Sequence, residues 1–450
     1  MRVTGAIFRS ALIAALGGLL FGFDTAVISG TTDQLREVFG LSSKALGFTV
    51  ASALIGTILG ALFSGKPADR FGRRAVLMVL GVLYFVSAVG CAIAWDWWSL
   101  VFFRFIGGLG VGGSSVVSPM YIAEISPPAA RGRLVAITQF NIVFGILLAF
   151  FSNYVIAQLV PGEGAWRWMF GVEAAPAAAF FGLLFLTPRS PRWLVAQGLA
   201  GEARAVLQRL GVGAEEIDRM IREIEESLEA ERRGLQEPLF QRRYRKPILL
   251  AVAIAAFNQL SGINALMYYA PAIFKMAGAG ADSALLQTVA VGGTNLVVTL
   301  LAMAVIDQFG RRKLMLAGSI GYIVSLSATA WAFYTYGNHF DKAGSMVVLA
   351  SLLVFIASHA FGQGAVIWVF ISEIFPNTVR ARGQALGSFT HWFMCALISW
   401  TFPVIADVSG GHAFAFYAAM MVLQLLWVIY VMPETKGVPL EEVQKTLGID

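Results

Sequence analysis

The stretch that decides the fold is Ala255–Phe274, AAFNQLSGINALMYYAPAIF. It is apolar and long enough to lie in a bilayer, where a spanning helix needs about 20 residues. It also carries polar side chains clustered around one glycine: Asn258, Gln259, Ser261, Gly262 and Asn264. Because hydrocarbon offers amides no hydrogen-bond partner, the cluster indicates a wet or ligand-filled cavity. Ser261-Gly262 predicts a broken helix, which is typical of a transporter binding site. The alternative is that the amides only join neighbouring helices.

The composition is that of a protein that crosses a membrane several times. Of its 450 residues, 57% are hydrophobic and 13% charged, and the mean hydropathy is +0.71. The first apolar run follows Arg2 and Arg9 and lacks a cleavage pattern, so it is predicted to be a retained signal anchor. The 4 histidines and 2 cysteines offer no metal-ligand spacing and no disulfide framework. We therefore expect no metal and no cofactor.

Twelve apolar segments approach the length that spans a bilayer. They cover residues 7–29, 44–65, 75–95, 98–121, 132–158, 166–187, 247–275, 284–306, 313–335, 344–372, 383–406 and 412–432. In the long polar insert that follows the sixth segment, Arg192–Leu210 and Ala214–Arg233 have the spacing of short amphipathic helices. We predict an all-α membrane protein with four parts: an N-terminal six-helix bundle (1–187), a cytoplasmic linker (188–246), a C-terminal six-helix bundle (247–432) and a cytoplasmic tail (433–450).

Lysine and arginine fix the orientation of these segments. When both termini, the insert and the loops after even-numbered segments are put on one side, that side holds 27 of the 33 basic residues. The positive-inside rule then places both termini and the insert in the cytoplasm. Because the net charge of +6 reflects this topology, we predict no nucleic-acid partner.

The chain repeats two of its motifs. Asp69–Arg74, DRFGRR, returns as Asp307–Arg312, DQFGRR. Glu124-Ile-Ser-Pro, followed by Arg131, returns as Glu373-Ile-Phe-Pro, followed by Arg380, with the same Glu-to-Arg spacing. The repeats predict two similar six-helix halves joined by the linker.

Three ionisable residues of the first half fall at similar depth in the predicted spans: Asp24, Arg104 and Glu173. A lone charge there is costly, so we expect Asp24 to pair with Arg104. Burial favours a neutral acid, whereas a nearby cation favours the carboxylate. We therefore hypothesise that Asp24 alternates between this ion pair and a protonated form, which would couple proton uptake to alternating access. The alternative is a static salt bridge.

Several motifs together resemble the sugar porter branch of the major facilitator superfamily. The loop Gly65–Arg74, GKPADRFGRR, and its second copy resemble the superfamily signature. The segments that resemble motifs of the branch are Phe21–Gly30, Pro119–Glu124, Ser190–Trp193, Gln259–Asn264 and Pro433–Gly437. The resemblance covers nearly the whole chain and implies two pseudo-symmetric bundles. The branch includes bacterial proton-coupled xylose symporters and facilitative glucose transporters.

The resemblance also implies a sugar site and two gates. A pyranose is bound by bidentate amides and an aromatic surface. The residues at the family's substrate positions are Gln139, Asn258, Gln259, Asn264, Asn295, Trp368, His391 and Trp392. Tyr268 and Tyr269 match the extracellular gate. The cytoplasmic gate would comprise Asp69, Arg73, Arg74, Glu124, Arg131, Asp307, Arg311, Glu373 and Arg380. Arg104 and Glu173 match positions linked to proton coupling, and Asp24 stands where facilitative carriers have Asn.

Several positions depart from the family pattern. Asn258 stands where relatives commonly have Gln, which is one methylene longer. His391 stands where relatives usually have Asn or Gln, and because a histidine can titrate near neutral pH, binding could depend on pH. Gly362–Trp368, GQGAVIW, lacks the usual prolines, and Gln363 is a candidate for a site role there. Arg189 replaces the Glu that usually precedes Ser-Pro-Arg. The choice between hexose and pentose stays open.

The expected function is the import of a monosaccharide by proton symport across a bacterial-type inner membrane. The expected partners are the sugar, the proton and the lipid bilayer, and a monomer is expected. A facilitative uniporter of the same fold is the first alternative. A non-transporting sugar sensor is the second, although only about 18 residues follow the last span. An enzyme is not expected, because the sequence shows no paired carboxylates, metal cluster or nucleophile constellation.

Overall fold

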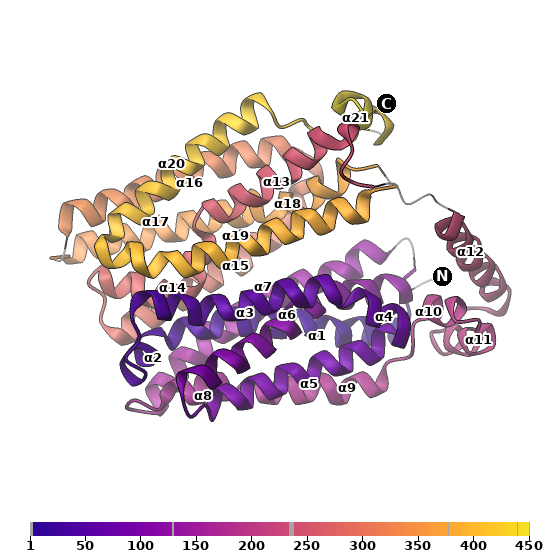
Figure 1. Ribbon diagram of the computed structural model, residues 1–450, viewed down its shortest axis with the longest axis horizontal. Coiled ribbons are helices and arrows are strands. Elements are labelled where there is room, and N and C mark those ends of the chain that lie inside the picture. The colour runs from indigo at the N-terminus through magenta and orange to yellow at the C-terminus, as the bar shows by residue number, and fades with distance from the viewer. Residues whose placement is uncertain are drawn as a thin grey trace. The chain divides into compact units, whose positions relative to one another are not determined.

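Figure 1 shows the computed structural model, which describes residues 3–127, 130–233, 238–337, 339–376, 378–438 and 440–449. Side chains are described for the same residues apart from 230–233, 306–307 and 440–441. Every regular element in this part of the chain is a helix. Among them, 12 segments are long and apolar enough to cross a membrane. The twelve predicted spans are therefore confirmed, and the protein is an all-α membrane protein.

The chain divides into two compact units. Unit 1 contains Met1–Thr25, Ile55–Ile146 and Arg167–Leu235, and unit 2 contains Ala26–Leu54, Leu147–Trp166 and Gln236–Asp450. Four helices pass from one unit into the other: α1 (Gly5–Val27), α3 (Ser43–Phe63), α7 (Arg131–Leu159) and α8 (Ala165–Gly171). The predicted bundles 1–187 and 247–432 thus differ from the units at the outer ends of the first-half spans, which group with unit 2.

Unit 1 is built around α6 (Trp97–Ile125). This helix begins at Trp97 because Asp96 and Ser99 form a capping box: the Asp96 carboxylate accepts the Ser99 N–H over 2.7 Å, and the Ser99 hydroxyl accepts the Asp96 N–H. Gly112 lets α3 approach α6 closely, since a Cβ there would collide with the carbonyl of Thr57. The remaining helices of unit 1 outside the linker are α4 (Gly65–Phe71), which joins two spans, α5 (Arg73–Ala92), α9 (Ala174–Leu183) and the short η3 (Leu184–Leu186).

The linker folds into three helices of unit 1: α10 (Pro191–Ala196), α11 (Ala200–Arg209) and α12 (Ala214–Arg233). They share a small apolar core that includes Leu194, Leu207 and Ile217. The predicted amphipathic stretch 192–210 is two helices, because Gly198 turns the chain with φ +77°. Trp193 donates from Nε1 to the main-chain oxygen of Asp69 over 2.9 Å, which holds these helices beside α4 (Figure 1).

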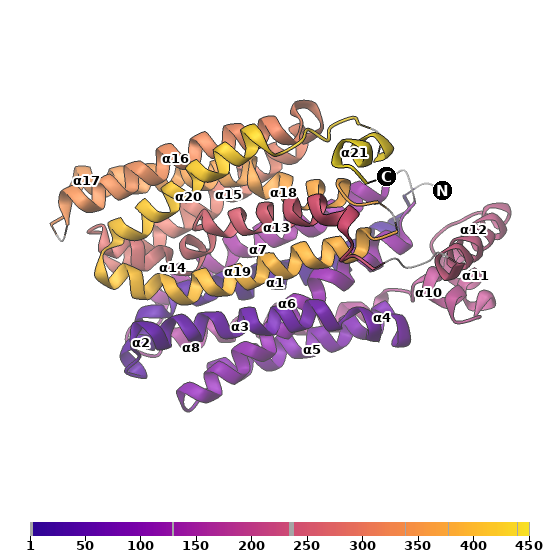
Figure 2. The ribbon, with the colours of Figure 1, turned by 45° about the horizontal axis from the view of Figure 1, so that its top comes forward.

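Unit 2 contains the second half and the outer ends of the first-half spans. Its helices are η1 (Ile28–Gly30), α2 (Thr32–Val38), η4 (Arg242–Tyr244), α13 (Arg245–Leu260), α14 (Ile263–Met276), α15 (Ala281–Phe309), α16 (Arg311–Tyr336), α17 (Lys342–Phe361), α18 (Gln363–Glu373), α19 (Arg380–Val408), α20 (Gly410–Tyr430) and α21 (Leu440–Leu447). Within unit 2, α2 lies beside α14, at the end opposite to α21 (Figures 1 and 2).

Three spans are broken where functional groups cluster. The predicted break in the seventh span is confirmed at Gly262, which separates α13 from α14 with φ +83°. A Cβ at this position would also collide with the ring of Tyr417. The tenth span breaks at Gly362, between α17 and α18, and the sixth breaks before Glu173, between α8 and α9. Neither of the last two breaks was predicted from the sequence, although Pro176 removes the N–H that would bond to Val172 at the break in the sixth span; the break at Gly362 has no nearby proline.

Candidate functional site

A buried ion pair lies inside unit 1. Arg104 on α6 donates from Nη1 to Asp24 Oδ1 over 3.0 Å, and the same nitrogen lies 3.3 Å from the main-chain oxygen of Asp24. Both side chains are almost fully buried. Since a charge at membrane depth is costly unless it is paired, each residue stabilises the other in its ionised form. The structure thus brings together the two residues that the sequence predicts to pair.

Glu173 is the third ionisable residue of this cluster. It precedes the first residue of α9 and is 2% exposed. Its Oε1 has no hydrogen-bond partner among the described residues, and neither has Nε of Arg104. The guanidinium of Arg104 lies instead over the ring of Phe170, with its carbon 5.6 Å from the ring centroid. The cluster therefore combines one ion-paired carboxyl with a second carboxyl that has a buried, unpartnered oxygen.

Small and hydroxylated side chains surround the Asp24–Arg104 pair. A Cβ on Gly107, one turn after Arg104, would lie 3.2 Å from Asp24 Oδ1 and would collide with the hydroxyl of Ser87. Glycine at this position therefore leaves the space that the carboxylate occupies. Two further turns along α6, the hydroxyl of Tyr84 lies 2.7 Å from Oγ of Ser114.

The polar cluster of the seventh span continues into a chain of hydrogen bonds inside unit 2. Asn264 donates from Nδ2 to Gln259 Oε1 (2.6 Å), and Gln259 donates from Nε2 to Asn258 Oδ1 (2.9 Å). Asn258 donates from Nδ2 to Gln363 Oε1 on α18 (3.2 Å). Gln363 in turn donates from Nε2 to Gln424 Oε1 on α20. We name these five residues the amide chain.

Aromatic rings lie beside the amide chain. Nε2 of Gln259 is 3.3 Å from Nδ1 of His391 on α19. The His391 ring has its centroid 5.1 Å from that of Trp368 and 4.9 Å from that of Trp392. Trp392 is 7% exposed, whereas Trp368 is 42% exposed. Amides next to an accessible indole suit a ligand with hydroxyl groups on one side and an apolar face on the other.

Two predicted substrate residues are not joined to the amide chain by any hydrogen bond in the described part of the molecule. Asn295 is buried on α15, where its Oδ1 lies 3.4 Å from the hydroxyl of Thr299 one turn away. Gln139 is exposed on α7 and belongs to unit 1. Their expected roles stay predictions.

Tyr268 and Tyr269 are buried at a second kink in the seventh span. Each is 2% exposed, and α14 departs from helical geometry at Tyr269 (φ −130°), just before Pro271. Tyr269 donates its hydroxyl to the main-chain oxygen of Ser399 over 2.8 Å and packs on Phe402, with 5.2 Å between the ring centroids. This segment of α14 is therefore fixed against α19.

The Asp69–Arg74 motif of unit 1 forms a compact ion-pair network. Arg73 lies 2.9 Å from Glu124 Oε1 through Nη2, and the hydroxyl of Ser190 donates to the second oxygen of Glu124. Arg74 points elsewhere, since it donates to the carbonyls of Leu184 and Phe185 at the end of the sixth span. The first arginine therefore holds the glutamate, and the second caps a helix end.

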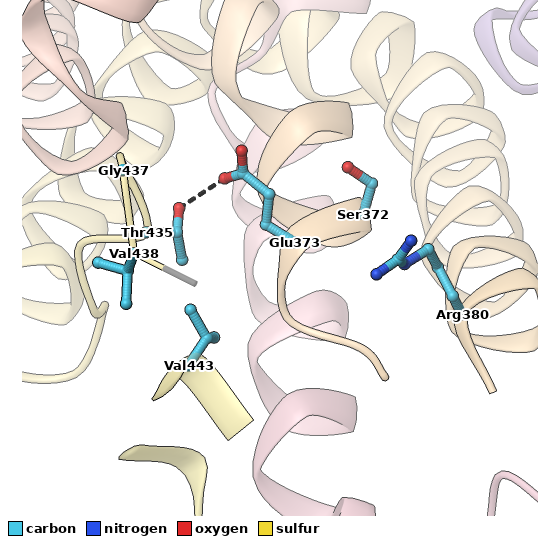
Figure 3. Close-up of a pocket in the computed structure, with 7 residues that line it drawn as sticks. All are labelled: Ser372, Glu373, Arg380, Thr435, Gly437, Val438 and Val443. Carbon is cyan, nitrogen blue, oxygen red and sulfur yellow. Dashed lines mark hydrogen bonds between the residues drawn. The ribbon is translucent and has the colours of Figure 1, made fainter. Parts of the chain in front are cut away.

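The motif of unit 2 repeats this arrangement of residues, although Arg311 bonds both carboxylate oxygens of its glutamate and Arg73 bonds only one. Arg311 pairs with Glu373 (Nη2 to Oε1, 2.8 Å), and Thr435 donates to Glu373 Oε2 over 2.6 Å (Figure 3). Arg312 donates to the carbonyls of Val428 and Ile429 at the end of the twelfth span. Glu373 and Thr435 also line a pocket of about 330 Å³. The predicted internal repeat thus extends to the hydrogen bonds of each copy.

Three of the remaining predicted gate residues make other contacts, and the side chain of the fourth is not described. Asp69, whose side chain is 71% exposed, lies 3.0 Å from Arg73 one turn away. Arg131 donates to the carbonyl of Ala123 over 3.1 Å, not to Glu124. Arg380, which lines the pocket in Figure 3, donates to the carbonyl of Phe375 over 3.3 Å. The side chain of Asp307 lies outside the described part of the structure.

Ion pairs at the outer end of unit 2 were not predicted from the sequence. Lys275 on α14 lies 2.6 Å from Asp33 on α2, and Arg36 on α2 lies 3.2 Å from Asp407 on α19. Each pair joins an outer end of the first half to a helix of the second. Such pairs between distant segments leave no local pattern, so no motif points to them.

Gln424 is a further member of the site that sequence reasoning missed. It lies in the middle of the apolar twelfth span and is fully buried. An isolated amide in such a span is itself a signal, because hydrocarbon cannot satisfy it. Ser319 on α16, whose hydroxyl accepts a hydrogen bond from Gln424 Nε2 over 2.8 Å, gives no comparable signal because serines are common in spanning helices.

Comparison with known proteins gives consistent results. Residues 10–447 match the family described as Sugar (and other) transporter. The D-xylose-proton symporter of Escherichia coli K12 is 40% identical over 97% of this chain and 95% of its own length. The arabinose-proton symporter of Bacillus subtilis is 36% identical over 98% and 95%. The inward-open structure of the xylose transporter XylE from E. coli matches with a TM-score of 0.86 and 38% identity over 98% of this chain and 99% of that one.

Proposed function

The chain belongs to the sugar transporter family, and from this premise we propose that it imports a hexose or pentose together with a proton. Its twelve spans have the major facilitator fold, and it is a transporter and not an enzyme. The observation that carries the proposal is the pairing of two sites: an acid buried against a single arginine in unit 1, and a chain of amides beside an accessible indole in unit 2.

The amide chain and its aromatic neighbours are the proposed sugar site of unit 2. Asn258, Gln259 and Asn264 carry both donors and acceptors, which a hydroxyl group can use at once. Trp368 offers the apolar surface on which a pyranose face packs. The neighbouring His391 is a further candidate ligand, because its ring already contacts Gln259. The expected contribution of Gln139 and Asn295 stays a prediction.

Asp24 is the proposed proton carrier. While Arg104 lies 3.0 Å away, the carboxylate is stabilised in its charged form. Movement of Arg104 away from it would leave a buried carboxylate without a cation, and protonation would remove that cost. Glu173, which lies in the same cluster with an unpartnered oxygen, is proposed to relay the proton.

A short stretch of chain connects the two sites. Asp24 lies near the end of α1, and η1 follows directly after this helix. Within unit 2, η1 packs against α14, which carries Asn264 and the two gate tyrosines. We therefore propose that the state of the Asp24–Arg104 pair is transmitted through the end of α1 to the sugar-binding helix.

The proposed cellular context follows from the charge pattern and the relatives. A bacterial-type inner membrane, cytoplasmic termini and a monomeric carrier are proposed.

The ion pairs Lys275–Asp33 and Arg36–Asp407 support an arrangement that is closed at the outer end.

Counterflow of labelled sugars in proteoliposomes tests the proposal. We expect accumulation of at least one hexose or pentose and acceleration of net uptake by an inward proton gradient. Counterflow that ignores the pH gradient would instead identify a uniporter. Absence of counterflow for every monosaccharide in the panel would contradict the proposal.

A further inference from the structure

We propose that Gln363 is a positioning residue that sets the orientation of the sugar-binding amides and thereby the sugar specificity. This inference rests on the proposed sugar site. Gln363 is the first residue of α18, directly after the break at Gly362, and is fully buried. Its Oε1 accepts from Asn258, and its Nε2 donates to Gln424. Because Gln363 lies between Asn258 and Gln424 in the amide chain, it acts on a ligand through Asn258 and not by direct contact.

All hydrogen bonds of the amide chain run in one direction. From Asn264 through Gln259, Asn258 and Gln363 to Gln424, each NH₂ group donates to the carbonyl oxygen of the next amide. An amide can be turned by 180° with little change in shape, so orientation in such a chain is decided by its end. Turning one member alone would place two NH₂ groups, or two carbonyl oxygens, against each other.

The buried end of the chain fixes this direction. Gln424 donates from Nε2 to the hydroxyl of Ser319 over 2.8 Å, and Ser319 donates to the carbonyl of Met315 over 2.7 Å. Since a main-chain carbonyl only accepts, the Ser319 hydroxyl must point toward it and must receive a donor from Gln424. The direction set at Met315 is thus transmitted, one hydrogen bond at a time, to Asn264.

A close helix contact allows Gln363 to take this position. Gly318 on α16 faces Gly362 at the break in the tenth span, and a Cβ on Gly362 would lie 2.9 Å from the Cα of Gly318. The small residues let the break approach α16 and so bring Gln363 between Asn258 and Gln424. Asn258 is one methylene shorter than the Gln common at this position, and Gln363 supplies the partner within its reach.

The Asn264 end of the amide chain determines which hydrogen-bond donors and acceptors face a ligand. Asn264 is only partly buried, and its Oδ1 accepts no hydrogen bond from another described residue. Asn258 and Asn264 each use one N–H in the chain and keep the second. The fixed direction therefore presents an acceptor at Asn264 and donors at the asparagines. A sugar whose hydroxyls match this order is favoured over its epimers and deoxy analogues.

Counterflow kinetics of Gln363→Met and Asn258→Ala, alone and combined, test this inference. Methionine has nearly the shape of glutamine and cannot continue the chain. We expect Gln363→Met to raise the KM for the best substrate about tenfold, with the maximal rate unchanged, because one amide of the site loses its partner. We also expect it to lose discrimination against the same deoxy sugars as Asn258→Ala. The double variant should be no worse than Asn258→Ala alone.

Two further variants complete the test. Gln424→Met, one step further from the ligand, should shift specificity in the same direction by a smaller factor. Gln287→Met is the matched control, because among the described residues Gln287 bonds only to Ser283 on its own helix. It should keep the wild-type KM and sugar preference.

Three results would overturn the inference while leaving the proposed function intact: an unchanged sugar preference in Gln363→Met, additive losses in the double variant, or an equal loss for all sugars with a lower maximal rate. A wild type that shows no counterflow of any monosaccharide would instead overturn the proposed function itself.

Discussion

The two halves of the molecule share the repeated DxFGRR and ExxP motifs and have different membrane interiors. In these motifs, Arg73 and Arg311 each hold a glutamate, and Ser190 and Thr435 each donate to that glutamate. At membrane depth, by contrast, the first half buries a charged cluster and the second half buries neutral amides.

This difference indicates that the two halves have different functions. Both copies have the contacts that hold helix ends together, because the spanning helices of each half begin and end at the membrane surface. The charged cluster can exchange a proton, whereas amides can exchange hydrogen-bond partners with a neutral, hydroxylated ligand. We infer that the proposed proton and sugar functions were separated between the two copies of one motif set.

The largest expected effect concerns the stability of the charged interior. Arg104→Gln leaves Asp24 buried without a cation, and breaking one partner of a buried pair costs about 3–5 kcal/mol. The double variant Asp24→Asn/Arg104→Gln removes both charges and should recover most of the melting temperature in detergent. If Arg104→Gln alone melts like the wild type, the pair does not stabilise unit 1.

The next effect tests the break that distinguishes the seventh span from its counterpart, the first span, where α1 runs without interruption over Gly5–Val27. Gly262→Ala forces a non-glycine residue to φ +83° and against Tyr417, at a cost of at least about 1–2 kcal/mol. The melting temperature and the rate of counterflow should both fall. Gly293→Ala, where a Cβ meets open space, is the control and should not lower the melting temperature. Equal melting of the two variants would contradict the role of this break.

A third prediction compares the two cytoplasmic copies directly. Glu124→Gln and Glu373→Gln each remove one partly buried ion pair, worth about 1 kcal/mol. Because the family resemblance assigns both glutamates to the cytoplasmic gate, we expect each variant to shift the equilibrium toward the inward-open form by about fivefold. Affinity for a membrane-impermeant sugar analogue added from outside should fall to the same extent in both. Glu202→Gln, which breaks an exposed pair with Arg189, is the control. A strong effect of one copy without the other would show that the motifs are not equivalent.

The smallest expected effect is a rise in affinity for a ligand added from outside, whereas the glutamate variants lower that affinity. Lys275→Ala breaks a half-exposed ion pair with Asp33, worth roughly 0.5 kcal/mol or less. Loosening the outer end should raise the affinity of the same outside ligand by about twofold at low salt, and less at high salt. A decrease in affinity would argue that this pair does not hold the outer end closed.

Much of this arrangement was predictable from polar residues in spans that are otherwise apolar, and from a repeated motif. Asn258–Asn264 and Asp24 place polar groups in apolar spans, and the repeated DxFGRR loop indicates duplication. The break at Gly262 and the pairing of Asp24 with Arg104 follow from these polar residues, whereas the number of spans follows from the length of the apolar segments.

Other features could not be predicted, because they depend on contacts between distant segments. The break at Gly362 lacks a proline signal, and the partners of Gln363 come from helices far along the chain. The grouping of Ala26–Leu54 with the second half reflects the packing of a folded state, which hydropathy does not encode.

Sugar-driven proton uptake into proteoliposomes, measured for the wild type and Asp24→Asn, tests the central claim most directly. The wild type should take up protons when sugar is added outside. Asp24→Asn should show sugar counterflow without a proton signal, because an amide can neither bind nor release the proton. Proton uptake that persists in Asp24→Asn, or that is absent from a wild type that still moves sugar, would contradict the assignment of the buried acid as the proton carrier.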